Sequence, residues 1–250
     1  MKFGILGFGN LGKAFSSALL CTGDVNAEDI YVCDNSDVAL SCAKKEHFHV
    51  FKPEEINRMI TDTDVFCIIV KSYVFEEIAK TIEKSSLSGK LIISMMAGVT
   101  FEQIHSLLGN VDLARAMPSI AIATNEGVIA YTKIPESVSS IFKKFGFAYQ
   151  TEPEEIEKVM AFAATGPAYA AYLVKALATA GKSMGFSDDV ASHIAALSFK
   201  YACNNTNFSE IIKSVATPGG ATEQGLNRMD ECDVPGIVTE AVRKAYERMT

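Results

Sequence analysis

The stretch KFGILGFGNLG, residues 2–12, decides the fold. Its first half is a short apolar run that predicts a buried strand, and its second half is a G-x-G-x-x-G turn. Apolar residues at helical spacing follow and end near Gly23, a plausible helix C-terminus. Strand, turn and helix therefore come in the order of a dinucleotide-binding α/β domain.

The three glycines of this turn have distinct predicted roles. Gly7 allows the tight bend, Gly9 lets the backbone approach a pyrophosphate, and Gly12 lets helix and strand pack closely. The N-terminus of the helix faces the negative charge of the pyrophosphate. The predicted cofactor-binding residues here are Gly7, Phe8, Gly9, Asn10, Leu11 and Gly12.

Apolar, β-branched runs alternate with helical segments over the first 150 residues, which is typical of a doubly wound parallel sheet. Most of these runs are continuous rather than alternating, as expected where helices cover both faces of a sheet. The predicted strands are 2–8, 30–33, 65–70, 90–94, 113–116 and 127–132, with 48–51 as a further candidate.

After about residue 150 the sequence shows only helical patterns. The acidic segment TEPEEIEKV, 151–159, marks the change, so we expect a Rossmann-type domain over 1–151 and an all-helical domain over 152–250. The predicted helices are 160–185, one that begins at Ser187, 207–215, 222–229 and 235–249. A helical region this rich in apolar side chains would expose a large patch if it stood alone. We therefore expect it to dimerise by packing on a second copy.

The chain of 250 residues is mildly acidic and rich in apolar side chains. Its 23 Lys+Arg and 30 Asp+Glu give a formal net charge of −7, which excludes the basic surface expected of a nucleic-acid-binding protein. The most membrane-like segment, 161–181, is interrupted by Gly166-Pro167 and Lys175, which favours a buried helix over a membrane span. We therefore expect neither a nucleic-acid nor a membrane partner.

Cysteine and histidine usage predicts a reducing compartment and no metal site. The six cysteines are scattered without a C-x-x-C pair, which favours small core side chains in the cytoplasm. The N-terminus becomes glycine-rich too early for a signal peptide, so we expect a cytoplasmic protein. His47 and His49 form H-x-H near Cys42, but no third ligand stands at a suitable spacing.

Asp34, at the end of the second predicted strand, bears on the choice of cofactor. A carboxylate there accepts hydrogen bonds from a ribose 2′-hydroxyl and repels a 2′-phosphate. Residues 35–37 include no Arg or Lys that could pair with this phosphate. Only Lys44 or Lys45 could fold back toward it. This pattern favours NADH over NADPH. The alternative is that Asp34 only caps the next helix.

A second candidate site lies in the segment TPGGAT, 217–222. Pro218 followed by two glycines predicts an exposed turn with several free backbone N–H groups, and the helix that follows adds the positive end of its dipole. The arrangement favours a bound carboxylate, flanked by the hydroxyls of Thr217 and Thr222. The alternative is a plain Gly-Gly linker between two helices.

Several motifs carry a family resemblance that covers nearly the whole chain. They are GFGNLG at 7–12, Val70-Lys71, SMMAGVT at 94–100, RAMP at 115–118, ATGPAY at 164–169 and VATPGGAT at 215–222. Together they resemble the pyrroline-5-carboxylate reductases, enzymes of the last step of proline synthesis. The Pro-Gly-Gly-Ala-Thr segment is the most specific of these motifs.

The resemblance implies NAD(P)H-dependent reduction of 1-pyrroline-5-carboxylate to L-proline in a homodimer or higher homo-oligomer. It implies that Thr222 faces the ring nitrogen, which makes Thr222 the candidate catalytic residue. The implied substrate-binding residues are Ser214, Thr217, Gly219, Gly220, Ala221 and Thr222. The implied cofactor-binding residues beyond the glycine turn and Asp34 are Ile69, Val70, Lys71, Ser72, Met95, Met96 and Ala97.

Some positions depart from the family pattern and leave alternatives open. Ser119 stands for an asparagine, Ser72 for a proline, and Lys175 stands where an acidic residue is common. One alternative is a divergent paralogue that reduces another imine or a carbonyl acid, and another is a non-catalytic nicotinamide-binding regulator. A third is an enzyme resembling the β-hydroxyacid dehydrogenases, with Lys175 or Lys182 as its lysine, although neither stands in the lysine motif of that family.

Overall fold

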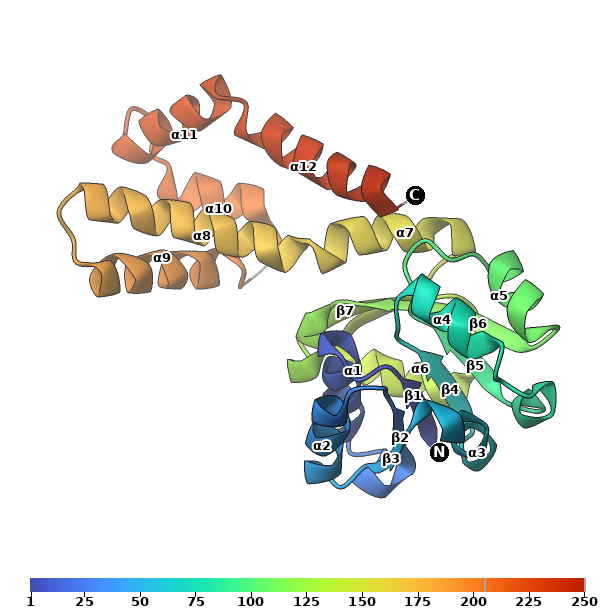
Figure 1. Ribbon diagram of the computed structural model, residues 1–250. Coiled ribbons are helices and arrows are strands. Elements are labelled where there is room, and N and C mark those ends of the chain that lie inside the picture. Colours follow the sequence, from blue (N-terminus) through green and yellow to red (C-terminus); the bar gives the residue numbers. More distant parts are fainter. Residues whose placement is uncertain (205, 250) are drawn as a thin grey trace. The chain divides into compact units, whose positions relative to one another are not determined.

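A computed structural model describes residues 1–204 and 206–249 (Figure 1), and the chain divides into two compact units. The first unit is Met1–Ala164 together with the last few residues of the chain, and the second is Thr165–Glu247. The division follows Ala164, whereas the boundary predicted at 151/152 coincides with the end of the last strand.

One eight-stranded sheet forms the centre of the first unit, in the order β3-β2-β1-β4-β5-β6-β7-β8. The strands are β1 (Phe3–Leu6), β2 (Ile30–Cys33), β3 (His49–Phe51), β4 (Val65–Ile68), β5 (Leu91–Ser94), β6 (Asp112–Pro118), β7 (Gly127–Tyr131) and β8 (Gly146–Gln150). Neighbouring strands from β3 to β6 are parallel, which confirms the predicted doubly wound fold.

The predicted parallel pattern ends at β7, which pairs antiparallel with β6. The two strands are joined by the short 3₁₀ turn η4 (Ile120–Thr124), which is too short for the crossover that parallel pairing needs. The eighth strand, β8, pairs parallel with β7 and was not predicted. Its side chains are mostly exposed or half-buried because it lies at the edge of the sheet, so its sequence has no continuous apolar run.

Helices cover both faces of this sheet (Figure 1). They are α1 (Asn10–Cys21), α2 (Asp37–Lys45), α3 (Ile56–Asp62), α4 (Ser72–Ala79), α5 (Phe101–Leu108), α6 (Glu136–Phe142) and α7 (Ile156–Val159). Successive strand residues belong to different cores: Cys67 packs in one buried cluster, and Phe66 and Ile68 pack in the other. Burial on both faces explains the continuous apolar runs in the sequence.

The second unit is all helical, as predicted. Its helices are α8 (Gly166–Ser183), α9 (Asp188–Ala202), α10 (Phe208–Val215), α11 (Ala221–Glu231) and α12 (Val234–Met249). The Ser187 hydroxyl caps α9 by accepting the N–H of Val190 at 3.4 Å. The helix predicted from residue 160 begins at Gly166 instead, after the π-helical stretch η7 (Met160–Ala164). Pro167 has no N–H to donate to the carbonyl of Ala163, so the α-helical pattern is interrupted there.

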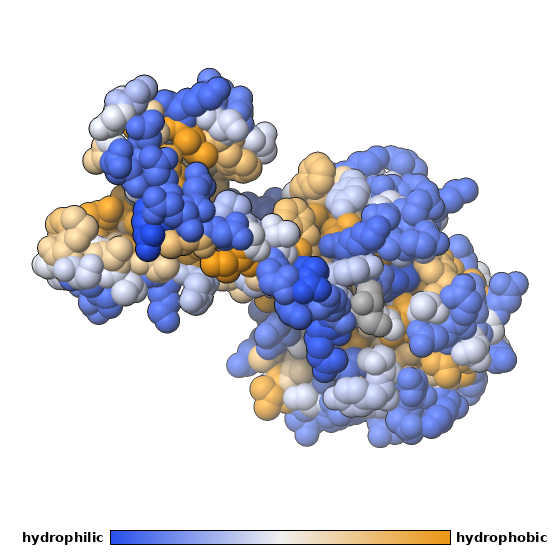
Figure 2. All heavy atoms as spheres, turned by 90° about the horizontal axis from the view of Figure 1, so that it is seen from above, coloured by the Kyte–Doolittle hydropathy of each residue, from blue (hydrophilic) through white to orange (hydrophobic). Residues whose placement is uncertain are grey.

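Small side chains make up the interior of this second unit. Within its described residues, the buried side chains are Ala178, Ala191 and Ala195, where α8 packs against α9. Large apolar side chains lie at its surface, where Figure 2 shows them in orange on the left. Among the described residues, no helix is long and apolar enough to cross a membrane.

Candidate active site

The glycine turn between β1 and α1 has the geometry of an anion-binding loop. Gly7 has φ +101°, and a Cβ on Gly12 would lie 2.2 Å from the carbonyl oxygen of Gly7, so only glycine fits at both positions. A Cβ on Gly9 would meet no atom within 4 Å. Gly9 is also the N-cap of α1, and no side chain caps that helix. Open space therefore lies in front of helix N–H groups, as a pyrophosphate requires.

The other residues of the turn divide between core and surface. Phe8 is 3% exposed and packs edge to face on Phe48 at 6.0 Å, and Leu11 is half-buried against the same core. Asn10 is exposed as the first residue of α1. The side chains of Phe8 and Leu11 therefore pack mainly in the core.

The remaining cofactor candidates lie at the same edge of the sheet. Asp34 follows β2, residues 69–72 follow β4, and residues 95–97 follow β5. The strands β2, β1, β4 and β5 are parallel neighbours, and the order of connection reverses between β1 and β4. Ligands of doubly wound sheets bind outside the carboxyl ends of the strands at such a reversal.

A cavity of about 350 Å³ opens at this reversal. The residues that line it are Leu6, Gly7, Cys33, Asp34, Asn35, Pro53, Val70, Tyr73, Val74, Glu77 and Ile78. Its lining therefore joins part of the glycine turn, the end of β2 and one face of α4. The mainly apolar lining and the carboxylate of Asp34 fit an adenosine group.

Asp34 is held by two backbone hydrogen bonds. Its Oδ2 accepts the N–H of Phe8 at 2.7 Å and its Oδ1 accepts the N–H of Ser36 at 2.8 Å. The alternative interpretation of Asp34 as the cap of α2 is wrong, because the Ser36 side chain caps that helix by accepting the N–H of Ala39. A carboxylate has about four acceptor sites, so capacity for a ribose hydroxyl remains.

The cavity contains a second acidic residue that the sequence did not single out. Glu77 lies on α4 and pairs with Lys80 at 2.7 Å, with both side chains largely exposed. Tyr73 on the same helix is 70% exposed, so its ring is available to a ligand. Burial first, and the charge of Asp34 second, raise the pKa of Cys33 to about 12, so this thiol is neutral at pH 7.

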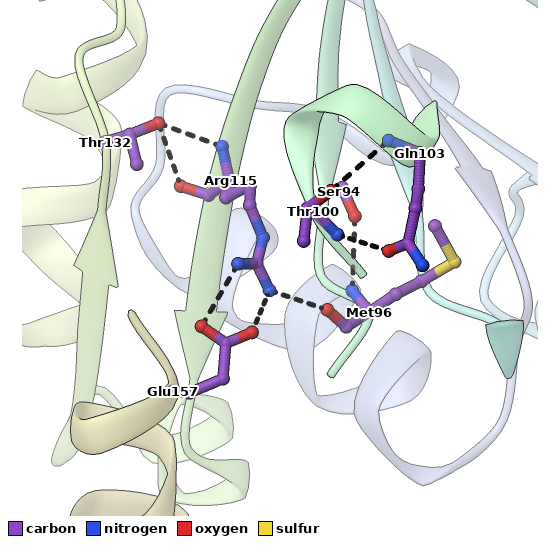
Figure 3. Close-up of polar contacts among 7 residues, drawn as sticks. All are labelled: Ser94, Met96, Thr100, Gln103, Arg115, Thr132 and Glu157. Atoms are coloured by element: carbon purple, nitrogen blue, oxygen red, sulfur yellow. Dashed lines mark hydrogen bonds and ion pairs between the residues drawn. The ribbon is translucent and has the colours of Figure 1, made fainter. Parts of the chain in front are cut away.

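A buried ion pair binds the loop after β5 (Figure 3). Arg115, on β6 and 3% exposed, donates from Nη2 to the carbonyl oxygen of Met96 at 3.0 Å. The same guanidinium binds the Glu157 carboxylate of α7 with two hydrogen bonds, of 2.5 and 3.1 Å. The side chains of Met95 and Met96 are buried, whereas Ala97 is exposed.

The predicted substrate residues lie together between α10 and α11. Ser214 is on the last turn of α10, Gly219 adopts φ +75°, and Thr222 is exposed on the first turn of α11. A Cβ on Gly220 would lie 2.5 Å from Oγ1 of Thr217, so this turn requires glycine.

The expectation of several free N–H groups in this turn needs a correction. The N–H of Gly219 donates to Oε2 of Glu223 at 2.8 Å, and the N–H of Gly220 donates to the carbonyl oxygen of Thr217 at 2.9 Å. Glu223 stands at the third position of α11, where a carboxylate is commonly bonded back to the preceding turn. Within the described chain, the N–H groups of Ala221, Thr222 and Glu223 have no acceptor, so these three remain for an anion.

Three residues depart from the family pattern, namely Ser119, Ser72 and Lys175, and the structure shows where each of them lies. Ser119 is 3% exposed, its hydroxyl accepts the N–H of Val128 at 3.0 Å, and its own N–H donates to the carbonyl of Val128. Ser119 therefore closes the turn between β6 and β7. Ser72 is the first residue of α4, and Lys175 is exposed on α8.

The doubly wound sheet, the open glycine turn and the cavity at the strand-order reversal define a nicotinamide-dinucleotide oxidoreductase with a helical second domain. Residues 2–98 match the family described as NADP oxidoreductase, coenzyme F420-dependent. Residues 153–250 match the family described as pyrroline-5-carboxylate reductase dimerisation, so the helical region is a dimerisation domain, as predicted.

Similar proteins agree over the full length. The pyrroline-5-carboxylate reductases of Aquifex aeolicus and Escherichia coli are each 28% identical to this chain, covering 99% of it and 96% of their own length. The crystal structure of Plasmodium falciparum pyrroline carboxylate reductase with NADP bound superposes with a TM-score of 0.86 at 20% identity, covering 100% of this chain and 97% of that one. The Coxiella burnetii reductase gives 0.86 at 22% identity, with 99% and 97% covered. Over its full length the chain is therefore similar to pyrroline-5-carboxylate reductases.

Proposed function

We propose that the protein reduces 1-pyrroline-5-carboxylate to L-proline with a reduced nicotinamide dinucleotide. The observation that carries this proposal is the presence of both halves of the required site in one chain. The first domain has a glycine turn with open space at Gly9, and the helical domain has the Thr217–Thr222 turn with unused N–H groups at the start of α11.

The reaction needs orientation and electrostatics more than strong acid–base catalysis. When bound, the reduced nicotinamide supplies a hydride, which adds to the carbon of the C=N bond while the nitrogen takes the bond electrons and ends as a protonated amine. A protonated imine is already electrophilic, so the protein has to hold the ring and anchor its carboxylate.

The residues of the second turn would do this. The N–H groups of Ala221 and Thr222 bind the substrate carboxylate, with help from the positive end of the α11 dipole and the hydroxyl of Thr217. The hydroxyl of Thr222 is the hydrogen-bond partner of the ring nitrogen. A threonine is a poor general acid, so water or the protonated form of the substrate supplies the proton.

NADH is the preferred cofactor in this proposal. Asp34 and Glu77 both line the cavity, and no Arg or Lys is among its described lining residues. Lys52, which precedes the lining residue Pro53 in the chain, is paired with Asp37. Two carboxylates disfavour a 2′-phosphate. The P. falciparum reductase has NADP bound, so this choice has to be tested on the present chain.

Two further proposals concern the setting of the enzyme. A cytoplasmic location is supported by the six cysteines, all of which are free thiols. A homodimer is the smallest assembly that covers the apolar surface of the helical unit.

The proposal is tested by following the oxidation of NADH and NADPH in parallel with pyrroline-5-carboxylate as acceptor. We expect turnover with both and a higher kcat/KM with NADH. Absence of turnover with either, in a protein that binds NADH, would overturn the reductase assignment and favour another imine or carbonyl substrate or a regulatory role.

A further inference from the structure

Arg115 connects three segments that are far apart in the sequence (Figure 3). Its backbone belongs to β6, opposite Ser94 of β5, and is bound by Thr132, whose hydroxyl accepts the Arg115 N–H at 2.9 Å. Its guanidinium reaches Met96 in the loop after β5 and Glu157 on α7. The side chain is therefore fixed from both ends.

Fold stability alone does not account for this arrangement. A buried ion pair is often no more stabilising than apolar side chains of the same volume, because both charges lose their water. Here the side chains of Arg115 and Glu157 are only 4% and 14% exposed. In the described chain, Nε of Arg115 is buried without a hydrogen-bond partner. In this position the guanidinium reaches Met96 and Glu157, but its own Nε–H is left without an acceptor.

The bond to Met96 determines the direction of the next N–H group. The carbonyl of Met96 and the N–H of Ala97 belong to one planar trans peptide, so they point in opposite directions. With the carbonyl held by Arg115, the N–H of Ala97 points away from the guanidinium. Within the described chain, the N–H of Met95 donates to the carbonyl oxygen of Ile68 and the N–H of Met96 donates to the hydroxyl of Ser94. The N–H of Ala97 has no acceptor.

We propose that Arg115, held by Glu157, is a positioning residue that presents the Ala97 N–H to the nicotinamide half of the cofactor. The inference rests on the proposed function, and it assigns residues 95–97 to that half because they follow β5, which lies on the opposite side of β1 from β2 and Asp34. The adenosine half depends on other groups, namely the glycine turn and Asp34. Loss of Arg115 should therefore weaken binding of the whole cofactor and leave binding of its adenosine half intact.

The test replaces both members of the pair, Arg115→Met with Glu157→Leu, so that no unpaired charge remains buried. The dissociation constants of NADH, by fluorescence titration, and of ADP-ribose, by calorimetry, are compared with those of the wild-type protein. We expect the Kd for NADH to rise about tenfold and that for ADP-ribose to change less than about twofold. The exposed pair Lys144–Asp24, replaced as Lys144→Met with Asp24→Leu, is the matched control and should change neither constant.

A second variant, Arg115→Lys, keeps the positive charge. Its ammonium group lacks the planar set of donors that binds the Glu157 carboxylate and the Met96 carbonyl together, so this variant should give an intermediate Kd for NADH. Unchanged affinity for NADH in the double variant, or an equal loss for NADH and ADP-ribose, would overturn the inference. The readout is binding, so a wild-type chain that binds NADH without reducing pyrroline-5-carboxylate would overturn the proposed reaction alone. A wild-type chain that binds no nicotinamide dinucleotide would overturn both.

Discussion

At the scale of single residues, Asp34 combines a structural and a selective task. Its two oxygens join the glycine turn to the loop after β2, so its position in the cavity is fixed before any cofactor binds. We predict that Asp34→Ala narrows the preference for NADH, with a change of about tenfold in the ratio of kcat/KM values, because the acceptor for the 2′-hydroxyl and the repulsion of a 2′-phosphate are both lost. Glu46→Ala, which removes an exposed charge outside the cavity, should leave the ratio unchanged. An unchanged ratio in Asp34→Ala would reduce Asp34 to a structural role.

Thr222 is exposed on α11 and has no side-chain partner within the described chain. We predict that Thr222→Ala lowers kcat at least about tenfold and leaves the melting temperature nearly unchanged, since only a hydrogen bond to the reacting nitrogen is lost. Thr222→Ser should restore much of the activity because it keeps the hydroxyl. Thr239→Ala, at an exposed threonine of α12, is the control. Equal activity of wild type and Thr222→Ala would remove this hydroxyl from the mechanism.

At the scale of elements, two glycines of the same turn have different roles: Gly12 is needed for folding and Gly9 for cofactor binding. We predict that Gly12→Ala costs about 1–3 kcal/mol of unfolding free energy, because its Cβ would lie 2.2 Å from the carbonyl oxygen of Gly7 and α1 would have to move. Gly9→Ala should leave stability unchanged within about 0.5 kcal/mol and abolish NADH binding, because its methyl group enters the open space in front of α1. Urea denaturation and fluorescence titration measure the two effects. Tight NADH binding by Gly9→Ala would place the pyrophosphate elsewhere.

Strands buried on both faces could be predicted from the sequence, and the edge strand β3 was a candidate, whereas the edge strand β8 was missed. Continuous apolar runs gave β1, β2, β4 and β5, because two cores need both faces of each strand. The edge strand β8 and the antiparallel direction of β7 depend on neighbours and loop length, which no local pattern contains. The same holds for the site. Motifs identified the glycine turn and Asp34, whereas Glu77 and Glu157 come from helices whose partners only the fold reveals.

At the scale of the whole molecule, the helical unit exposes more large apolar side chains than a free surface tolerates. Those on α9 are Val190, Ile194, Leu197 and Tyr201, and their spacing places them along one stripe of the helix. Among the described residues of the unit the buried side chains are alanines, so its own interior accounts for little of its apolar area. A dimerisation domain needs such a surface, and a second copy of this chain is the partner that the family match indicates.

We predict that Leu197→Glu separates the assembly into monomers with lower thermal stability and little reductase activity. Leu197 is 64% exposed in the single chain, so a carboxylate costs nothing there unless another chain covers it, and burying an unpaired charge in an interface is strongly unfavourable. Size-exclusion chromatography with light scattering measures the mass. Val38→Glu, at a site 74% exposed in the first unit, is the matched control and should remain assembled and active. If Leu197→Glu kept the wild-type mass, the stripe on α9 would not be the interface and another apolar face of the helical unit would have to serve.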